Sequence, residues 1–178
     1  MCDTSPVRFC AYIAVSVDGY VASSDGGVAW LDSFQAESYG YDDFMQQIDA
    51  VVIGRTTFDQ AMGFGELPYK GKSTFVLASR PIESPPPQTT AWQDGGAKLI
   101  AHLRGMSLQR DVWLFAGPKC NHAFRELGAV DTYELYVMPV LLGDGIPLFG
   151  CSNAKTLLRL TDNHVFSDGV VKLVYEPV

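Results

Sequence analysis

The stretch Val51-Val52-Ile53-Gly54-Arg55-Thr56-Thr57-Phe58 joins a short apolar run to a glycine and then to a polar turn. Its first three residues are β-branched and apolar, which predicts a strand covered on both faces. Gly54 permits a tight turn, or the close approach of another molecule to the backbone. Thr56 and Thr57 can satisfy free N–H groups at the start of a helix that runs on towards Ala61. The stretch therefore predicts a buried strand that turns directly into a helix.

The same turn has the chemistry of an anion site. A helix N-terminus presents unpaired N–H donors and the positive end of the helix dipole, and Arg55 adds a full positive charge there. Phosphate is the most common anion in such a place. An ordinary strand-to-helix turn with a surface arginine explains these eight residues equally well, so the interpretation depends on what the rest of the chain supplies.

Composition narrows the class of protein. A chain of 178 residues is expected to form one domain over 1–178, with a substantial core. Hydrophobic residues make up 47% and charged residues 19%, which is typical of a folded globular protein. The net charge of −7 argues against nucleic acid and anionic membranes as partners, but it permits a small anionic ligand.

Location and metal content can also be predicted. No apolar run has the length of a membrane span, and the N-terminus lacks a signal-peptide pattern, so we expect a cytoplasmic protein. The cysteines have no zinc-like spacing and are expected to be reduced; they are Cys2, Cys10, Cys120 and Cys151. No histidine sits in a metal-ligand pair, and no metal site is expected.

Periodicity and turn residues predict alternating strands and helices. Strands are expected at 7–17, 20–22, 51–53, 73–79, 89–92, 111–116, 132–137, 156–166 and 170–176. Helices are expected at 37–48, 55–61, 97–103 and 119–127, and 139–150 is expected to be a loop. The last two strands are separated by Ser167-Asp168-Gly169, a good hairpin turn. The order predicts an α/β sandwich with a central, mostly parallel sheet and an antiparallel edge.

Three common nucleotide-binding and catalytic motifs are incomplete or absent in the sequence. Gly71-Lys72-Ser73 ends like a P-loop, but Glu66 occupies the position of the required first glycine. Gly143-Asp144-Gly145 begins like a dinucleotide fingerprint, but Leu148 replaces its third glycine. No G-x-S-x-G is present in the sequence, so the nucleophile elbow of α/β-hydrolases is absent.

Three expected strand ends carry residues that are suited to bind anions. Beside Gly54-Arg55-Thr56, the pair Ser79-Arg80 ends one strand with a hydroxyl and a guanidinium, which suit a phosphate monoester. Gly117-Pro118-Lys119 is again a glycine turn that leads into a helix, with a lysine in the first turn. Ligands of parallel α/β sheets bind outside the carboxyl ends of the strands. Three such elements on one edge predict a ligand with several phosphates, such as a dinucleotide.

Four motifs carry a family resemblance. The residues IGRTTF at 53–58 resemble an element of the dihydrofolate reductase fold. The run SVDGYVA at 16–22 resembles a signature of the C-terminal reductase domain of the riboflavin-biosynthesis deaminase–reductase. The runs DGGVAWL at 25–31 and PVLLGDGIPLF at 139–149 are similar to those of stand-alone bacterial members. The resemblance extends from about Arg8 to Tyr175 and implies a dihydrofolate reductase-like three-layer α/β/α sandwich.

The resemblance implies NADPH as cofactor, held by four segments at strand ends. Ala14 and Val15 would lie beside the nicotinamide. The pyrophosphate would be held by Gly54, Arg55 and Thr56, which also reach towards the 2′-phosphate, and by Gly117, Pro118, Lys119 and Cys120. The adenosine side would be lined by Leu77, Ser79 and Arg80, the last two at the 2′-phosphate. The family often has two glycines where this chain has Ala116-Gly117.

On the substrate side, the resemblance implies Asp18, with Trp30 and Phe34 nearby. A turn explains Asp18 without any ligand, and core packing explains Trp30. True dihydrofolate reductases have an acidic residue five positions after the loop tryptophan, and that position is the neutral Gln35 here. Dihydrofolate is therefore not the expected substrate. A group of aromatic residues could form either a stacking pocket or core: Phe34, Tyr39, Tyr41 and Phe44.

The function expected from these features is transfer of a hydride from NADPH to a small pterin- or ribosylaminopyrimidine-like heterocycle. The resemblance implies an NADPH-dependent oxidoreductase similar to dihydrofolate reductase and to 5-amino-6-(5-phosphoribosylamino)uracil reductase, with the loop 23–28 excluding water. Two other classes stay open: a nucleotide-binding sensor or scaffold without turnover, and a structural homodimer with an empty cleft. The resemblance and the apolar C-terminal strands also predict a homodimer.

Overall fold

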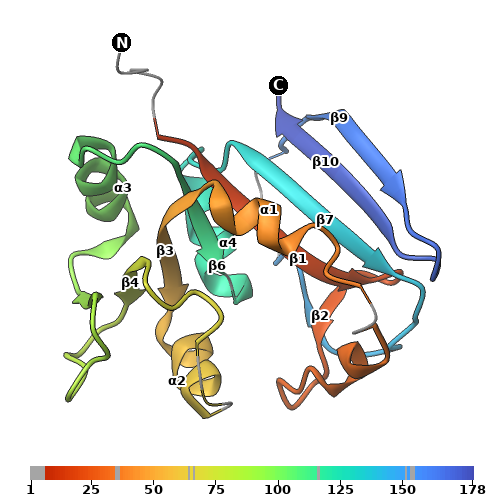
Figure 1. Ribbon diagram of the computed structural model, residues 1–178, viewed down its shortest axis with the longest axis horizontal. Helices are drawn as coiled ribbons and strands as arrows, with labels where there is room; N and C mark the ends of the chain where they lie inside the picture. Colours follow the sequence, from red (N-terminus) through yellow and green to blue (C-terminus); the bar gives the residue numbers. More distant parts are fainter. Residues whose placement is uncertain are drawn as a thin grey trace.

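A central sheet of eight strands organises the molecule, in the order β5-β4-β3-β6-β1-β7-β10-β9 (Figure 1). The computed structural model describes residues 7–34, 37–63, 65, 67–115, 117–150, 152 and 155–178. The strands are β1 (Phe9–Ser16), β3 (Ile48–Gly54), β4 (Ser73–Leu77), β5 (Thr89–Trp92), β6 (Asp111–Phe115), β7 (Thr132–Met138), β9 (Leu158–Val165) and β10 (Val171–Pro177). A separate two-stranded sheet pairs β2 (Tyr20–Ala22) with β8 (Ile146–Pro147).

Strand direction divides the sheet into two parts. From β5 to β7 every pair is parallel. The strand β10 pairs antiparallel with β7 and with β9, and the short turn at 167–169 joins β9 to β10. The mostly parallel sheet with a C-terminal antiparallel hairpin is thus confirmed.

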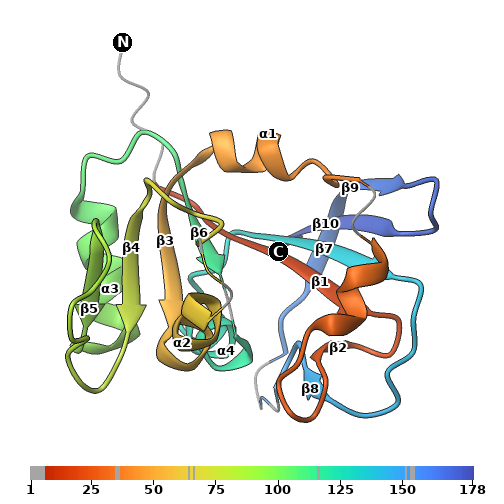
Figure 2. The ribbon, with the colours of Figure 1, turned by 60° about the horizontal axis from the view of Figure 1, so that its bottom comes forward.

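Helices cover both faces of the parallel part. The helices α1 (Tyr41–Gln46) and α2 (Arg55–Gly63) lie on one face, and α3 (Gly95–Gly105) and α4 (Pro118–Glu126) lie on the other (Figures 1 and 2). Successive side chains of β3 alternate between these layers. Val52 packs in the cluster with α3 and α4, and Val51 and Ile53 pack in the cluster with α1 and α2. All three are fully buried, and each such side chain stabilises the fold by about 1.5–3 kcal/mol.

Three local features differ from the sequence-based expectations. The helix expected at 37–48 is confined to α1, because Tyr39 and Gly40 have φ angles of 49° and 77° and Ile48 already belongs to β3. A 3₁₀ helix, η1 (Ala29–Phe34), follows the glycine-rich loop where no helix was expected. The expected loop 139–150 contains β8, which pairs with β2 across the small sheet.

The described residues include no membrane-spanning helix and no metal-binding cluster. None of their helices is long and apolar enough to cross a bilayer. They contain no group of three His, Cys, Asp or Glu residues placed to hold a metal ion. Cys10 and Cys120 are free and buried, whereas Cys2 and Cys151 lie outside the described residues.

Candidate functional site

The segments expected to bind phosphate meet at one edge of the sheet. Gly54 pairs with Leu77 across β3 and β4, and Ile53 pairs with Phe115 across β3 and β6. The carboxyl ends of these parallel strands therefore bring together 54–56, 77–80 and 117–119. The strand β1 lies next to β6, so Ala14 and Val15 continue the same edge. The structure thus brings all four segments expected for the cofactor to neighbouring strands.

The starts of α2 and α4 touch one another. A Cβ atom on Gly117 would lie well inside van der Waals contact of the Thr57 hydroxyl, so this approach requires a glycine. A Cβ on Gly54 would meet the Cβ of Cys120 at 3.9 Å. The two helices have nine residues each, and no side chain caps the first N–H groups of α4. Two helix N-termini, with their positive dipole ends, therefore converge on one place.

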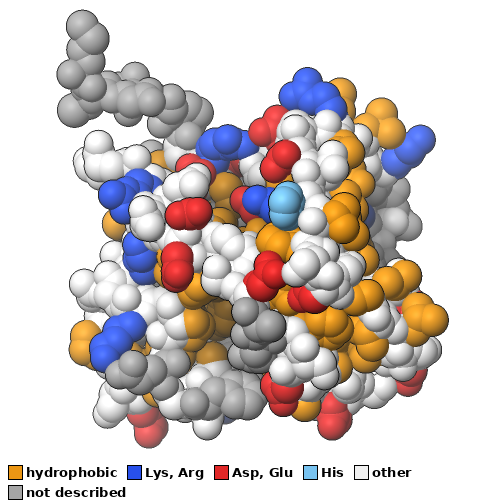
Figure 3. Space-filling model, turned by 45° about the vertical axis from the view of Figure 1, so that its right-hand side comes forward, with side chains coloured by type: hydrophobic (Ala, Val, Ile, Leu, Met, Phe, Trp, Pro, Cys, Tyr) orange, Lys and Arg blue, Asp and Glu red, His pale blue; other side chains and the backbone are white. Residues whose placement is uncertain are grey.

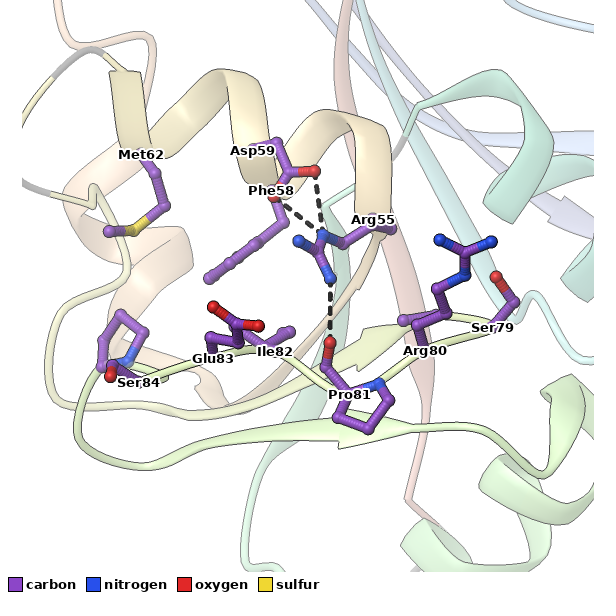
Figure 4. A pocket seen from close by; sticks show the side chains of 12 residues that line it. Arg55, Phe58, Asp59, Met62, Ser79, Arg80, Pro81, Ile82, Glu83 and Ser84 are labelled. Carbon is purple, nitrogen blue, oxygen red and sulfur yellow. Dashed lines mark hydrogen bonds and ion pairs between the residues drawn. The ribbon is translucent and has the colours of Figure 1, made fainter.

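A cleft of about 610 Å³ lies between α2 and the segment that follows β4, and we call it the cofactor cleft (Figure 4). Arg55 and Arg80 extend into it, with Ser79 beside Arg80. The Arg55 Nε donates to both carboxylate oxygens of Asp59 at 2.8 Å, and its Nη1 donates to the Pro81 carbonyl at 3.4 Å. Arg80 is exposed and forms no hydrogen bond or ion pair with the described residues. Its guanidinium is therefore available to a ligand.

The residues present fit a phosphate-bearing dinucleotide. Two guanidinium groups and two converging helix starts supply the donors that phosphates need. Lys119 is exposed in the first turn of α4. Cys120, by contrast, is a packing residue: burial raises the pKa of its thiol to about 12, and the side chain fills the space beside Gly54. Ala116 lies outside the described residues, so its effect on this edge stays a prediction.

A second cavity, the aromatic pocket, occupies about 240 Å³ on the α1 side of the sheet. It is lined by Tyr12, Ala14, Leu31, Phe34, Glu37, Tyr39, Tyr136 and Met138. Ala14 belongs both to this pocket and to the expected nicotinamide position, so the pocket adjoins the place expected for the nicotinamide. Tyr12, Tyr136 and Glu37 were missed by sequence reasoning. Alternation along β1 would have placed Tyr12 beside Ala14, but the pairing of Ala14 with Tyr136 of β7 could not be predicted.

Hydrogen bonds fix the aromatic pocket at its rim. The Tyr39 hydroxyl donates to the carboxylate of Asp168 in the β9–β10 turn. The Ser167 hydroxyl donates to Glu37 Oε1 at 2.9 Å. These two bonds tie segment 37–40 to the hairpin turn, and they hold the pocket rim against the sheet.

The phenols of the pocket are held in the neutral form. The Tyr136 hydroxyl donates to Glu134 Oε2 at 3.4 Å, and Lys172 Nζ lies 2.9 Å from the same oxygen. Burial is the main cause that raises the pKa of Tyr12 and of Tyr39 to about 12 each. Burial, followed by Tyr12 and Glu134, also raises the pKa of Tyr136. All three therefore remain hydroxyl donors at neutral pH.

The residues expected on the substrate side separate in the structure. Phe34 lines the aromatic pocket, whereas Asp18 and Trp30 do not. Asp18 accepts hydrogen bonds from the Ser16 hydroxyl at 2.6 Å and the Gly143 amide at 2.7 Å. These bonds, the Ser16 hydroxyl first, lower the pKa of Asp18 and join the turn after β1 to the loop before β8. Trp30 packs in the cluster around Tyr136, and its Nε1 is buried without a partner among the described residues.

The remaining aromatic candidates divide between pocket and core. Tyr39 lines the pocket. Tyr41 and Phe44 pack against Trp113, with ring centroids 6.0 and 5.4 Å away, and they belong to the core layer under α1. Gln35, at the position of the acid in dihydrofolate reductases, lies outside the described residues.

Comparisons with known proteins identify the family. A family model described as the RibD C-terminal domain matches residues 76–172. The protein YwjB of Bacillus subtilis, which is itself uncharacterized, is 34% identical over 89% of this chain and 92% of its own length. The chain belongs to the RibD C-terminal domain family.

Solved structures agree with this assignment. A Shewanella sp. PV-4 structure, named for riboflavin biosynthesis, has a TM-score of 0.79 and 26% identity, and the match covers 97% of this chain and 99% of that one. Dihydrofolate reductase of Enterococcus faecalis, solved with NADP(H), has a TM-score of 0.64 and 16% identity over 96% of each chain. The second likeness shows the fold alone. The dihydrofolate reductase-like α/β architecture is thereby confirmed.

Proposed function

We propose that this member of the RibD C-terminal domain family is an NADPH-dependent reductase of a small heterocycle. One observation carries the proposal. Four consecutive parallel strands, β4, β3, β6 and β1, end at one edge, and they align a cleft that contains two arginines, two helix N-termini and an aromatic pocket. The cleft and the helix N-termini suit phosphates, and the aromatic pocket suits a flat ring. Their order along the edge matches a ligand with phosphates at one end and a reactive ring at the other.

The chain's own residues would bind and orient the cofactor. Arg80 and Ser79 would hold the 2′-phosphate, and the starts of α2 and α4 would hold the pyrophosphate. Ala14, with its small side chain, would leave room for the nicotinamide beside the aromatic pocket. When bound, NADPH supplies the hydride. The pocket would hold the acceptor in the reacting orientation, and the loop 23–28 would exclude water.

Equilibrium binding of NADPH and NADH tests the proposal, because the two cofactors differ by the 2′-phosphate alone. We expect Arg80→Ala to weaken NADPH by about tenfold or more and NADH by less than about twofold, since a hydrogen bond to a charged group is worth about 1.5–3 kcal/mol. Arg110→Ala is the matched control, because Arg110 is an exposed arginine just before β6, at the opposite edge of the sheet.

The variants and the wild type give separate answers. Absence of binding of either cofactor to the wild-type protein would overturn the reductase proposal. Equal binding of NADPH and NADH by the wild type would remove the role given to Ser79 and Arg80. The same would follow if Arg110→Ala weakened NADPH as much as Arg80→Ala.

A further inference from the structure

The walls of the aromatic pocket suit a flat ring. Tyr12 and Tyr136 lie with ring centroids 4.5 Å apart and an interplanar angle of 40°, and Phe34 and Tyr39 complete the aromatic lining. Leu31 and Met138 add apolar contacts from η1 and β7. The volume of about 240 Å³ is small for a ligand site and accommodates one or two fused rings.

One carboxylate lines this pocket, and two more bond to the hydroxyls of its tyrosines. Glu37 is the charged residue of its lining, and Asp168 holds the Tyr39 hydroxyl at the rim. Glu134 accepts from Tyr136, but Lys172 at 2.9 Å neutralises it. Glu37 and Asp168 therefore leave this side of the pocket negative. After burial, which is the main cause, the same two carboxylates contribute to the raised pKa of Tyr39.

We propose that the acceptor bound in the aromatic pocket is a flat heterocycle without a phosphate or carboxylate, with a hydrogen-bond-donating or cationic edge that faces Glu37. This inference rests on the proposed reductase function and specifies its substrate. Aromatic faces attract flat and cationic rings, and a carboxylate binds N–H donors. An anionic substituent held near Glu37 would be repelled.

The two ends of the site therefore have opposite preferences. The cofactor cleft contains two donors to phosphate, Arg55 and Arg80, although Asp59 and Glu83 also line it. The described lining of the aromatic pocket contains no cation, and its one charged residue, Glu37, opposes phosphate. The proposed acceptor thus differs from the substrate of 5-amino-6-(5-phosphoribosylamino)uracil reductases, which carries a phosphate. The arrangement would also prevent the cofactor from binding in the reverse direction.

Two matched pairs of probes test the substrate class. The first pair is 6-hydroxymethylpterin and pterin-6-carboxylate, and the second is 6-methyluracil and uracil-6-carboxylate. Binding is measured by fluorescence and by calorimetry, with and without saturating NADP⁺. We expect the neutral member of at least one pair to bind about tenfold or more tightly than its carboxylate.

Three variants test whether the preference for the neutral probe arises in the aromatic pocket. Glu37→Gln should reduce the preference to within about threefold, because the amide keeps its size and loses its charge. Glu126→Gln is the matched control, since Glu126 lies on α4 at the other face of the sheet and its loss should change nothing. Phe34→Ala should weaken both members of a pair alike.

The outcomes separate this inference from the proposed function. Equal binding of neutral and anionic probes, retention of the preference in Glu37→Gln, or no binding of any probe would overturn the inference. If NADPH binds in any of those cases, the reductase proposal still stands. If NADPH does not bind but the probe preference appears and depends on Glu37, the pocket assignment stands and the reductase proposal fails.

Discussion

At the scale of single residues, Gly54, Arg55 and Arg80 are the proposed contacts of the cofactor phosphates. Each has a local signal in the sequence, because a glycine turn or a cation stands at the end of a strand. Asp18 also follows a strand, but its carboxylate accepts hydrogen bonds from the backbone amides of Leu142 and Gly143. Those partners are more than 120 positions away in the sequence, so no local pattern predicts these hydrogen bonds. The Asp18 side chain thus has a structural role in this chain.

Asp59 is bonded to Arg55 at the wall of the cofactor cleft. Its carboxylate holds the Arg55 guanidinium and adds negative charge to the wall of the cofactor cleft. We expect Asp59→Asn to strengthen NADPH binding by about two- to fivefold, because an exposed ion pair of about 0.2–1 kcal/mol is removed and a repulsive charge is lost. Calorimetric titration measures this change. Weaker NADPH binding by Asp59→Asn would show instead that the ion pair orients Arg55 for the ligand.

At the scale of elements, the order of strands and helices followed from periodicity, but the contacts between elements did not. The helix expected over 37–48 was too long, because the pattern of apolar residues continued into β3 and could not reveal the left-handed backbone of Tyr39 and Gly40. The 3₁₀ helix η1 was missed because Trp30 and Leu31 pack through tertiary contacts rather than by repeating along a helix face. Both misses concern the wall of the aromatic pocket.

The contact between α2 and α4 depends on the absence of a side chain at Gly117. We expect Gly117→Ala to lower the free energy of unfolding by about 1–3 kcal/mol and to weaken NADPH binding, because the new methyl group meets the Thr57 hydroxyl. Thr57→Ala in the same chain removes that hydroxyl and should restore much of both losses. Urea denaturation and cofactor titration of the two single variants and the double variant measure the coupling. Additive losses in the double variant would contradict the proposed clash.

At the scale of the whole molecule, the homodimer stays a prediction, and the side of β9 and β10 is where it would form. Every residue of the edge strand β9 is exposed, and Leu158, Leu160 and Val165 are among the exposed apolar side chains. Leu160 pairs with Tyr175, and Val165 pairs with Val171. Figure 3 shows hydrophobic side chains gathered on this side of the molecule. A second copy would cover this surface and protect the open strand edge.

Light scattering at micromolar concentration tests the dimer. The expected mass is twice the 19.5 kDa of one chain, and Leu160→Asp should yield the single-chain mass without loss of helix or strand signal in circular dichroism. Val17→Asp is the control, because Val17 is an exposed apolar residue in the turn after β1. A wild-type protein of single-chain mass would refute the homodimer.

The proposed cofactor site extends along one edge of the sheet, from the cofactor cleft to the aromatic pocket. A crystal structure of the protein grown with saturating NADP⁺ is the decisive test of this site. We expect the 2′-phosphate at Ser79 and Arg80, the pyrophosphate between the starts of α2 and α4, and the nicotinamide beside Ala14 at the mouth of the aromatic pocket. Crystals without bound cofactor, or with the nicotinamide at Arg80 and the adenosine in the aromatic pocket, would contradict this expectation.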